Sequence, residues 1–289
     1  MAAERSICAP DGHQWSDWVP GAPGAQAKTR ICHRCGWFEQ DDKQFMAGRP
    51  KSGKASYRQY VGAGERYDLI AAMTFNLLTT LGVREHHRVL DIGCGSLRNG
   101  RLLIPYLNAG NYVGFDPAQW AVEEAIKNET GEDLIRIKQA RFFFSTSPAA
   151  LDAALKFDYA FAQGIFVHSP MSLIDGWLAK TAACLEDNGL FVASFGAGET
   201  DYQGDSWVYP SRVTYRMETM QAAAERHGFV FRPLHWRHPH GLEWVAFARP
   251  AHDMSWFTEE SLTWNHKVDV DPGYRIWSWE TGYRPPMAQ

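Results

Sequence analysis

The sequence predicts an α/β protein built on a doubly wound, mainly parallel sheet and preceded by a small metal-binding module. Two observations predict the sheet: an apolar strand runs directly into a glycine turn, and a second apolar strand ends in an acidic residue. A C-x-x-C pair near the N-terminus predicts the module. In doubly wound sheets, ligands bind at the carboxyl ends of the strands, where the glycine turn and the acid are both expected.

Composition limits the range of functions. The chain has 289 residues, of which 45% are hydrophobic and 21% charged, enough for one large domain with a small appendage. A net charge of −4 is unlike that of a dedicated nucleic-acid binder, which is usually strongly basic. The sequence lacks a secretory signal and any stretch near the roughly 18 apolar residues of a membrane helix. We therefore expect a cytoplasmic protein that does not enter the membrane.

Four segments follow from these patterns. Residues 1–45 form the metal-binding module, 46–56 a polar linker, 57–250 the α/β domain, and 251–289 an aromatic C-terminal extension. The tryptophans of the extension argue against a disordered tail. They leave three roles open: packing across the α/β domain, a homodimer contact, or a lid over the substrate.

The N-terminal module is expected to bind structural Zn²⁺ and to resemble a short zinc ribbon. The four candidate ligands are Cys8, His13, Cys32 and Cys35. Two thiolates of a C-x-x-C knuckle converge on one ion, and a second pair completes a tetrahedron that leaves no open position for chemistry. A segment this small has too few aliphatic residues to fold without a metal or disulfides. His33 is a competing ligand of poor geometry, and reduced cysteines in a loop are the alternative.

The central segment begins with a strand, a turn and a second strand. A helix is predicted over 57–81, followed by a strand at Val89–Ile92 and a tight turn at Gly93 and Gly95. A second helix then leads to a strand that ends in Asp116. Glycine fits such a turn because it has no Cβ to clash with a ligand. The dinucleotide fingerprint G-x-G-x-x-G fails here, since Arg98 stands where the third glycine belongs.

The remaining elements continue the alternation of strands and helices. Strands are predicted at 142–144, at the start of 157–170, and at 189–195, 229–236 and 243–250, with helices at 171–185 and 217–228.

The motif V-L-D-I-G-C-G-S at residues 89–96 closely resembles the first motif of class I S-adenosylmethionine-dependent methyltransferases. The resemblance covers roughly residues 57–250. It implies a Rossmann-like, seven-stranded methyltransferase sheet, an enzyme that transfers a methyl group, and S-adenosylmethionine as its cofactor. The strand order is implied by the resemblance alone.

The resemblance also implies how the cofactor is held. Asp91 would order the turn and receive the ammonium group of the cofactor, and Asp116 would accept hydrogen bonds from both ribose hydroxyls. Ser145 or Thr146 would lie near the adenine. The implied cofactor-binding residues are Asp91, Gly93, Gly95, Ser96, Asp116, Pro117, Ser145, Gln163 and Gly164.

Two histidines are candidates for the catalytic step. His168 follows the fourth strand, beside the expected methyl donor, and is the first choice for a base or a substrate ligand; capping of the next helix is the alternative. His238 is expected on the substrate side, although a second metal site within the cluster at 235–240 is a competing interpretation. Arg98 and Arg101 either reach a carboxylate or form surface ion pairs.

The acceptor is expected to be small. The signatures of adenine-N6 and cytosine-C5 methylation are missing, and the segment 93–107 together with W-V-Y-P at 207–210 is similar to bacterial methyltransferases of sugar and natural-product pathways. These similarities favour O-methylation of a small-molecule, sugar or natural-product substrate by in-line transfer, with a histidine base. The alternative is an RNA or protein methyltransferase whose zinc module holds the macromolecule. A scaffold without activity is disfavoured by the intact motif.

Overall fold

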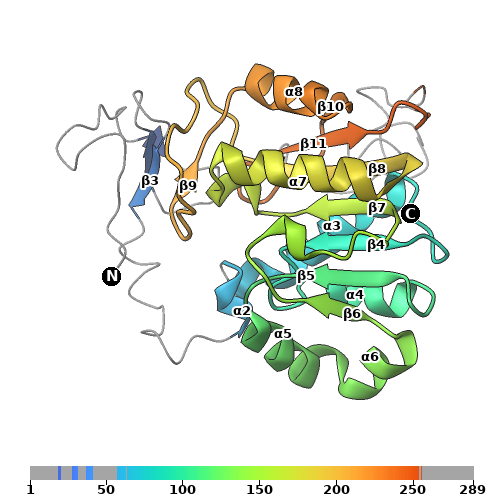
Figure 1. Ribbon diagram of the computed structural model, residues 1–289. Coiled ribbons are helices and arrows are strands. Elements are labelled where there is room, and N and C mark those ends of the chain that lie inside the picture. The colour runs from blue at the N-terminus through green and yellow to red at the C-terminus, as the bar shows by residue number, and fades with distance from the viewer. Residues whose placement is uncertain are drawn as a thin grey trace, which may run out of the picture.

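The computed structural model describes residues 57–62, 64–253 and 255, together with the backbone of three short strands between residues 19 and 41. Its α/β domain has a central sheet with helices on both faces (Figure 1). No helix in the described part is both long and apolar enough to span a bilayer.

The central sheet has seven strands in the order β10-β11-β8-β7-β4-β5-β6. Its strands are β4 (Val89–Ile92), β5 (Tyr112–Phe115), β6 (Arg141–Phe143), β7 (Phe157–Ala162), β8 (Leu185–Phe195), β10 (Val230–Leu234) and β11 (Glu243–Ala248). Neighbouring strands from β6 to β8 pair in parallel, while β11 pairs antiparallel with both β8 and β10. The Rossmann-like, seven-stranded sheet implied by the resemblance is therefore confirmed.

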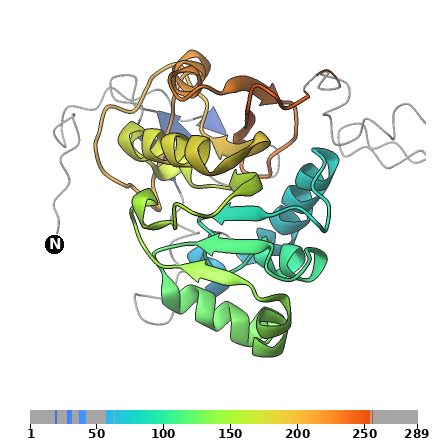
Figure 2. The same ribbon diagram turned by 45° about the vertical axis from the view of Figure 1, so that its right-hand side comes forward.

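The central strands are continuous apolar runs because both of their faces are covered. All four residues of β4 and of β5 are buried. Helices α3 (Tyr67–Thr80) and α4 (Gly100–Tyr106) pack on one face, and α7 (Met171–Cys184) and α8 (Met217–Arg226) on the other (Figure 2). Strands that are buried on both sides lose the alternation of a half-exposed strand, as parallel sheets generally do.

The prediction of one continuous helix over 57–81 is wrong. The structure has a short α2 (Tyr57–Tyr60), a one-turn 3-10 helix at Gly64–Arg66, and then α3. Gly62, with φ 120°, interrupts the helix because this backbone conformation lies outside the helical region. The break lets α2 pack against α5 (Gln119–Ala125), away from the axis of α3.

A second, four-stranded sheet joins the N-terminal segment to the α/β domain. It consists of β1 (Val19–Pro20), β2 (Lys28–Ile31), β3 (Trp37–Asp41) and β9 (Arg212–Val213), in that order. Strand β3 pairs antiparallel with β9, beside which it lies in Figure 1. No pattern in the sequence predicts a strand as short as β9.

The predicted zinc ligands Cys8, His13, Cys32 and Cys35 lie outside the described residues. In sequence, Cys32 and Cys35 fall between β2 and β3, which pair with Ile31 opposite Phe38. Within the described residues there is no cluster of His, Cys, Asp or Glu suited to a metal. The zinc site therefore stays a prediction, as do the roles of the extension beyond residue 255.

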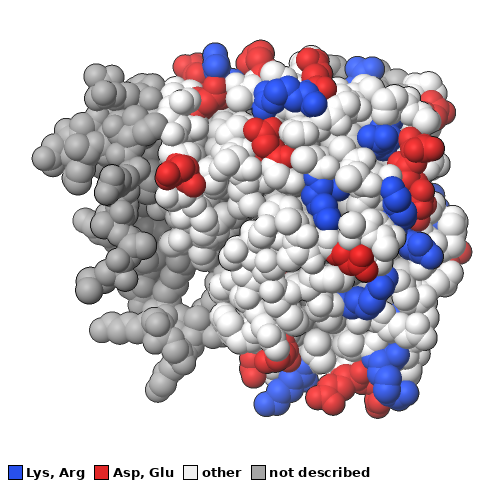
Figure 3. Space-filling view, viewed as in Figure 1, with Lys and Arg blue, Asp and Glu red and all other residues white. Residues whose placement is uncertain are grey.

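Charged side chains of both signs are interspersed on the face shown in Figure 3. An area without charged side chains lies at the centre-left of this face.

Candidate active site

The glycine turn forms directly at the end of β4. Gly93 and Gly95 have φ values of 74° and 49°, and the backbone N–H groups of Gly93 and Cys94 donate to the carbonyl of Phe115 at 2.7 and 3.2 Å. A Cβ on Gly93 would overlap the side chain of Ile165, which follows β7. The turn therefore requires glycine for its backbone conformation and for its close neighbours.

Asp116 lies beside this turn, at the end of β5. One of its carboxylate oxygens accepts the backbone N–H of Gly95 at 2.9 Å, and the other accepts that of Ala118 at 2.7 Å. Burial raises the pKa of Asp116, and the two backbone N–H groups oppose that shift. Each oxygen of a carboxylate can accept a further hydrogen bond. A fixed, buried carboxylate with remaining acceptor capacity fits the ribose diol of S-adenosylmethionine.

The segment 57–62 lies over the turn and Asp116. The sequence did not predict this position of the segment. The Tyr60 ring meets Trp120 edge-on at 5.1 Å, and Asp116 contributes, after burial, to raising the pKa of Tyr60. A Cβ on Gly95 would contact the side chain of Val61. An aromatic pair beside a ribose-binding acid can also contact a nucleobase. Residues that precede the motif by a whole helix therefore lie beside the turn and Asp116.

Asp91 is the second carboxyl group near the turn. It is 1% exposed and accepts the hydroxyl proton of Tyr112 at 2.8 Å. Burial raises its pKa to about 7, Asp116 adds to the shift, and Tyr112 and Arg98 oppose it. Its hydrogen bond therefore goes to the neighbouring strand, whereas the turn itself is held by Phe115 and Asp116.

The raised pKa of Asp91 predicts a pH-dependent cost to folding. A carboxyl group whose folded-state pKa is raised contributes stability that is complete below the unfolded pKa and is lost as the pH rises through about 7. Asp91→Asn cannot ionise yet still accepts from Tyr112. The free energy of unfolding of Asp91→Asn minus that of wild type should therefore be about 2 kcal/mol larger at pH 8 than at pH 5. Urea titrations of both proteins without cofactor measure this, and a gain independent of pH would contradict it.

Arg98, Gln163 and His238 form a buried hydrogen-bonded chain. Arg98 donates to the carbonyl of Val61 at 2.8 Å and to the side-chain oxygen of Gln163. The amide nitrogen of Gln163 then faces Nε2 of His238 at 3.0 Å. Because a guanidinium only donates, it fixes the orientation of the Gln163 amide. The sequence predicts either a contact with a carboxylate or a surface ion pair for Arg98. The structure excludes the surface ion pair, because Arg98 is 7% exposed.

His238 is neutral, and its acceptor nitrogen faces an N–H group of the protein. Burial, together with the nearby His240 and Arg98, lowers the pKa of His238 well below its ordinary value. Its Nε2 faces Gln163, while its Nδ1 faces the backbone N–H of His240 at 3.1 Å. A neutral imidazole has one acceptor nitrogen. In either tautomer that nitrogen is engaged within the protein, which disfavours His238 as the base.

His168 is held in one tautomer beside the same site. Its Nδ1 lies 2.6 Å from the carbonyl oxygen of Ser211, which can only accept, so Nδ1 carries the proton and Nε2 the lone pair. The ring also meets Trp207 and Tyr209 edge-on, at 5.5 and 4.9 Å between centroids. The alternative role as a helix cap is wrong, because α7 has Pro170 at its N-cap position and no side-chain capping bond.

The other candidate residues differ in their placement. At the end of β7, the backbone N–H of Gly164, a residue with φ 73°, donates to the hydroxyl oxygen of Ser194 at 2.8 Å. Ser96 is fully buried, and its carbonyl accepts the hydroxyl of Tyr67 at 2.6 Å. Pro117 directly follows Asp116, and Ser145 accepts the N–H of Ser147 at 3.1 Å in the turn after β6.

The histidine cluster at 235–240 does not form a second metal site. The rings of His238 and His240 lie 5.9 Å apart, but the described residues contain no group of three or more His, Cys, Asp or Glu suited to a metal ion. Arg66 donates to the carbonyl of Pro239 at 2.6 Å, and Arg212 to that of His240 at 3.4 Å. These cations, after burial, help to lower the pKa of His240 to about 3. Arginines therefore surround this turn, which disfavours a further cation.

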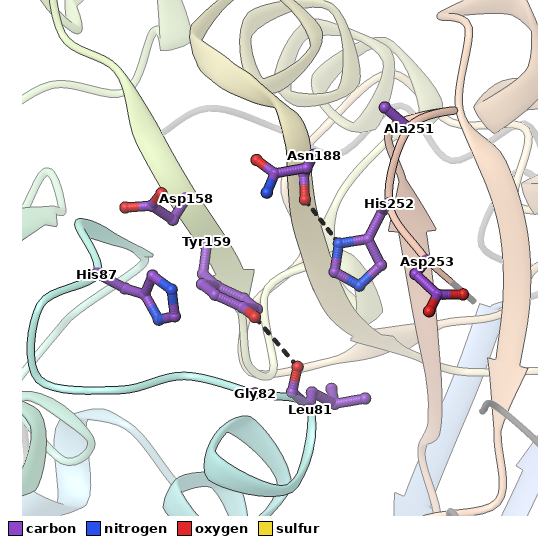
Figure 4. Close-up of a pocket in the computed structure, with 9 residues that line it drawn as sticks. All are labelled: Leu81, Gly82, His87, Asp158, Tyr159, Asn188, Ala251, His252 and Asp253. Carbon is purple, nitrogen blue, oxygen red and sulfur yellow. Dashed lines mark hydrogen bonds between the residues drawn. The ribbon is translucent and has the colours of Figure 1, made fainter. Parts of the chain in front are cut away.

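A cavity of about 420 Å³ lies at the opposite end of the strands from the glycine turn, near the amino ends of β4 and β7 (Figure 4). It is lined by Leu81, Gly82, His87, Asp158, Tyr159, Asn188, Ala251, His252 and Asp253. His252 lies 2.6 Å from the Asn188 carbonyl, and Tyr159 donates to that of Leu81 at 3.2 Å. Ligands of doubly wound sheets bind at the carboxyl ends of the strands, so the glycine turn remains the candidate active site.

The sequence of residues 90–191 matches the family described as methyltransferase domain. This segment contains the glycine turn, Asp116, Gln163 and His168, and it spans five of the sheet's strands, β4 to β8. Over these residues, which hold the candidate site, the chain is similar to methyltransferase domains.

Solved methyltransferase structures resemble the chain at low identity. The apo form of the methyltransferase SibL is 17% identical with a TM-score of 0.49; the match covers 65% of this chain and only 57% of SibL. Magnesium protoporphyrin IX methyltransferase from Synechocystis PCC 6803 with bound SAM is 16% identical, with a TM-score of 0.49 and coverage of 67% and 89%. The glycopeptide N-methyltransferase MtfA with S-adenosyl-L-homocysteine is 13% identical, with a TM-score of 0.49 and coverage of 63% and 90%.

Proposed function

We propose that this protein methylates an oxygen atom of a small molecule, with a sugar or another natural product as the acceptor, and that His168 is the base. The observation that carries the proposal is the hydrogen bond from His168 Nδ1 to the Ser211 carbonyl, at 2.6 Å. It places the lone pair on Nε2, as removal of a hydroxyl proton requires.

The protein holds the methyl donor through groups that are already fixed. S-Adenosylmethionine, when bound, supplies a methyl group activated by its sulfonium. Asp116 would accept the ribose hydroxyls, and the glycine turn would admit the methionine moiety without steric clash. The segment 57–62 would exclude water from this side, with Tyr60 and Trp120 beside the ribose. In-line transfer depends largely on such positioning.

His168 acts on the acceptor. The acceptor oxygen bonds to the methyl carbon as the carbon–sulfur bond breaks, and the hydroxyl proton passes to Nε2 of His168. S-Adenosylhomocysteine and the methyl ether are the products. The carbonyl of Ser211 stabilises the resulting imidazolium through Nδ1–H.

Two aromatic rings beside His168 support a small acceptor. Trp207 is 47% exposed, and Tyr209 lies on another side of the imidazole, where its hydroxyl donates to the Tyr60 carbonyl at 2.6 Å. Exposed aromatic faces suit sugar rings and aromatic compounds. RNA would instead require clustered cations that contact phosphates, and the face in Figure 3 has charges of mixed sign.

Transfer of a radiolabelled methyl group tests the acceptor class. The protein is incubated with methyl-labelled S-adenosylmethionine and either the dialysable or the macromolecular fraction of a cell extract. We expect label to enter the dialysable fraction, in a product that is stable to mild base, as an ether is. Label confined to the macromolecular fraction, and removed from it by nuclease or protease, would instead establish the alternative of an RNA or protein methyltransferase.

We further propose that residues 1–45 bind one structural Zn²⁺ through Cys8, His13, Cys32 and Cys35. Elemental analysis of the purified protein should give one zinc per chain, and Cys32→Ser should lose it while keeping its affinity for S-adenosylhomocysteine. Cys184→Ala is the matched control, since Cys184 is buried at the end of α7. Protein without zinc, or Cys32→Ser that retains it, would refute the site.

A further inference from the structure

Among the residues that the structure describes, Arg98 has no acidic partner, although it is a buried cation. It is 7% exposed, and its Nε has no hydrogen-bond partner among the described residues. Its other nitrogens donate to uncharged oxygens, those of Val61 and Gln163. No carboxylate of the described residues lies within 4.0 Å of its guanidinium. Burial lowers the pKa of Arg98 to about 10, so the group stays protonated at neutral pH.

Such a group calls for a ligand on energetic grounds. Burial of a charge costs free energy that only a counter-charge or several good hydrogen bonds can offset. Arg98 is neutralised by neither, because two neutral acceptors satisfy only part of its five N–H donors. An anion that binds here would meet a donor set already dehydrated and oriented.

The position of Arg98 identifies which anion fits. It follows the glycine turn and precedes α4, and a Cβ on Gly164 would lie 4.0 Å from its Nη2. Its guanidinium is thus enclosed by the turn, the end of β7 and the segment 57–62. Asp116 marks the place of the ribose at the end of β5. Arg98 contacts instead the end of β7, where the methionine moiety would extend.

Asp91 adds a complementary charge. Each of the two residues shifts the pKa of the other through its charge, yet they form no ion pair. A separated carboxyl group and guanidinium on either side of one turn match the two charges of an amino-acid zwitterion. The ammonium would lie toward Asp91 and the carboxylate toward Arg98.

We infer that Arg98 binds the α-carboxylate of S-adenosylmethionine and of S-adenosylhomocysteine, and that Gln163 positions the guanidinium for this contact. The inference rests on the proposed methyl-donor site. A charge-assisted, two-pronged contact of this kind should strengthen binding by about 30- to 100-fold. Arg98 also holds Val61, so the test must separate carboxylate binding from support of the segment 57–62.

Calorimetry with two ligands makes this separation. Wild-type protein is titrated with S-adenosylhomocysteine and with its decarboxylated analogue, which differs only in lacking the carboxylate. We expect wild type to bind the former about 30- to 100-fold more tightly. In Arg98→Gln, which keeps an N–H donor for Val61, the two ligands should bind equally, at the wild-type affinity for the analogue. Arg101→Gln is the matched control, because Arg101 pairs with Asp68 at the surface at 2.5 Å.

Each outcome decides the inference. Equal weakening of both ligands in Arg98→Gln would show that Arg98 only supports the fold, and an unchanged preference would place the carboxylate elsewhere. A wild-type protein that does not distinguish the two ligands would overturn the inference even if the variant failed to fold. Absence of binding by either ligand to wild type would refute the methyl-donor site itself, which is a separate result.

Discussion

Replacement of His168 by alanine is expected to lower kcat by two to four orders of magnitude and to leave the affinity for S-adenosylhomocysteine unchanged. The loss is that of a general base. Without the imidazole, the acceptor hydroxyl must lose its proton to water, although the methyl donor remains bound by Asp116 and the glycine turn. Steady-state assays give kcat, and calorimetry gives the affinity for the cofactor product.

His238→Ala is the control for this prediction. The acceptor nitrogen of His238 is already engaged by Gln163 or by the backbone N–H of His240, so this variant should retain most of its turnover. A normal kcat in His168→Ala would remove His168 from the mechanism. A larger loss in His238→Ala than in His168→Ala would reverse the assignment of the base.

Asp116→Asn should raise the Kd for S-adenosylhomocysteine by about 100-fold or more, which corresponds to about 3 kcal/mol. An asparagine has a single acceptor oxygen. Its amide group would oppose the N–H of Gly95 or of Ala118, and one ribose hydroxyl would lose its acceptor. Both the turn and the ligand contact are therefore weakened by one substitution. Titration calorimetry measures the effect.

Asp158→Asn is the matched control for this experiment. Asp158 also accepts a backbone N–H, that of Arg88 at 2.7 Å, but it lies at the opposite edge of the sheet. The two substitutions thus make the same chemical change at different distances from the proposed ribose. If the two variants bound S-adenosylhomocysteine equally well, Asp116 would have no part in holding the cofactor.

The sequence predicts the centre of the fold well because its signals there are local. Strand β4, the turn at Gly93 and Gly95, and strand β5 are each specified by a few consecutive residues: an apolar run, glycines with positive φ, and an acid after the strand. The elements missed depend on distant contacts. The helix break occurs at Gly62, a single glycine within a pattern that is otherwise periodic. Its consequence is that Tyr60 lies near Asp116, and this contact arises only in the tertiary structure.

The two arginines after the turn show the limit of periodicity. Arg98 and Arg101 stand less than one helical turn apart and were equivalent by sequence. The structure buries the first against Gln163 and Val61, and pairs the second with Asp68 at the surface. The difference comes from the strand β7 and the segment 57–62, both remote in sequence. No local pattern encodes it.

The pairing of β3 with β9 connects the N-terminal segment to the residues beside His168. Trp37 and Phe38 face Val213 and Arg212, and the preceding residue, Ser211, supplies the carbonyl that orients His168. The backbone beside the proposed base is thus held partly by a strand from far upstream in the chain. A chimera with a different N-terminal segment would need a strand that pairs with β9 as β3 does. Without such a strand, we expect the His168 ring to lose its fixed orientation.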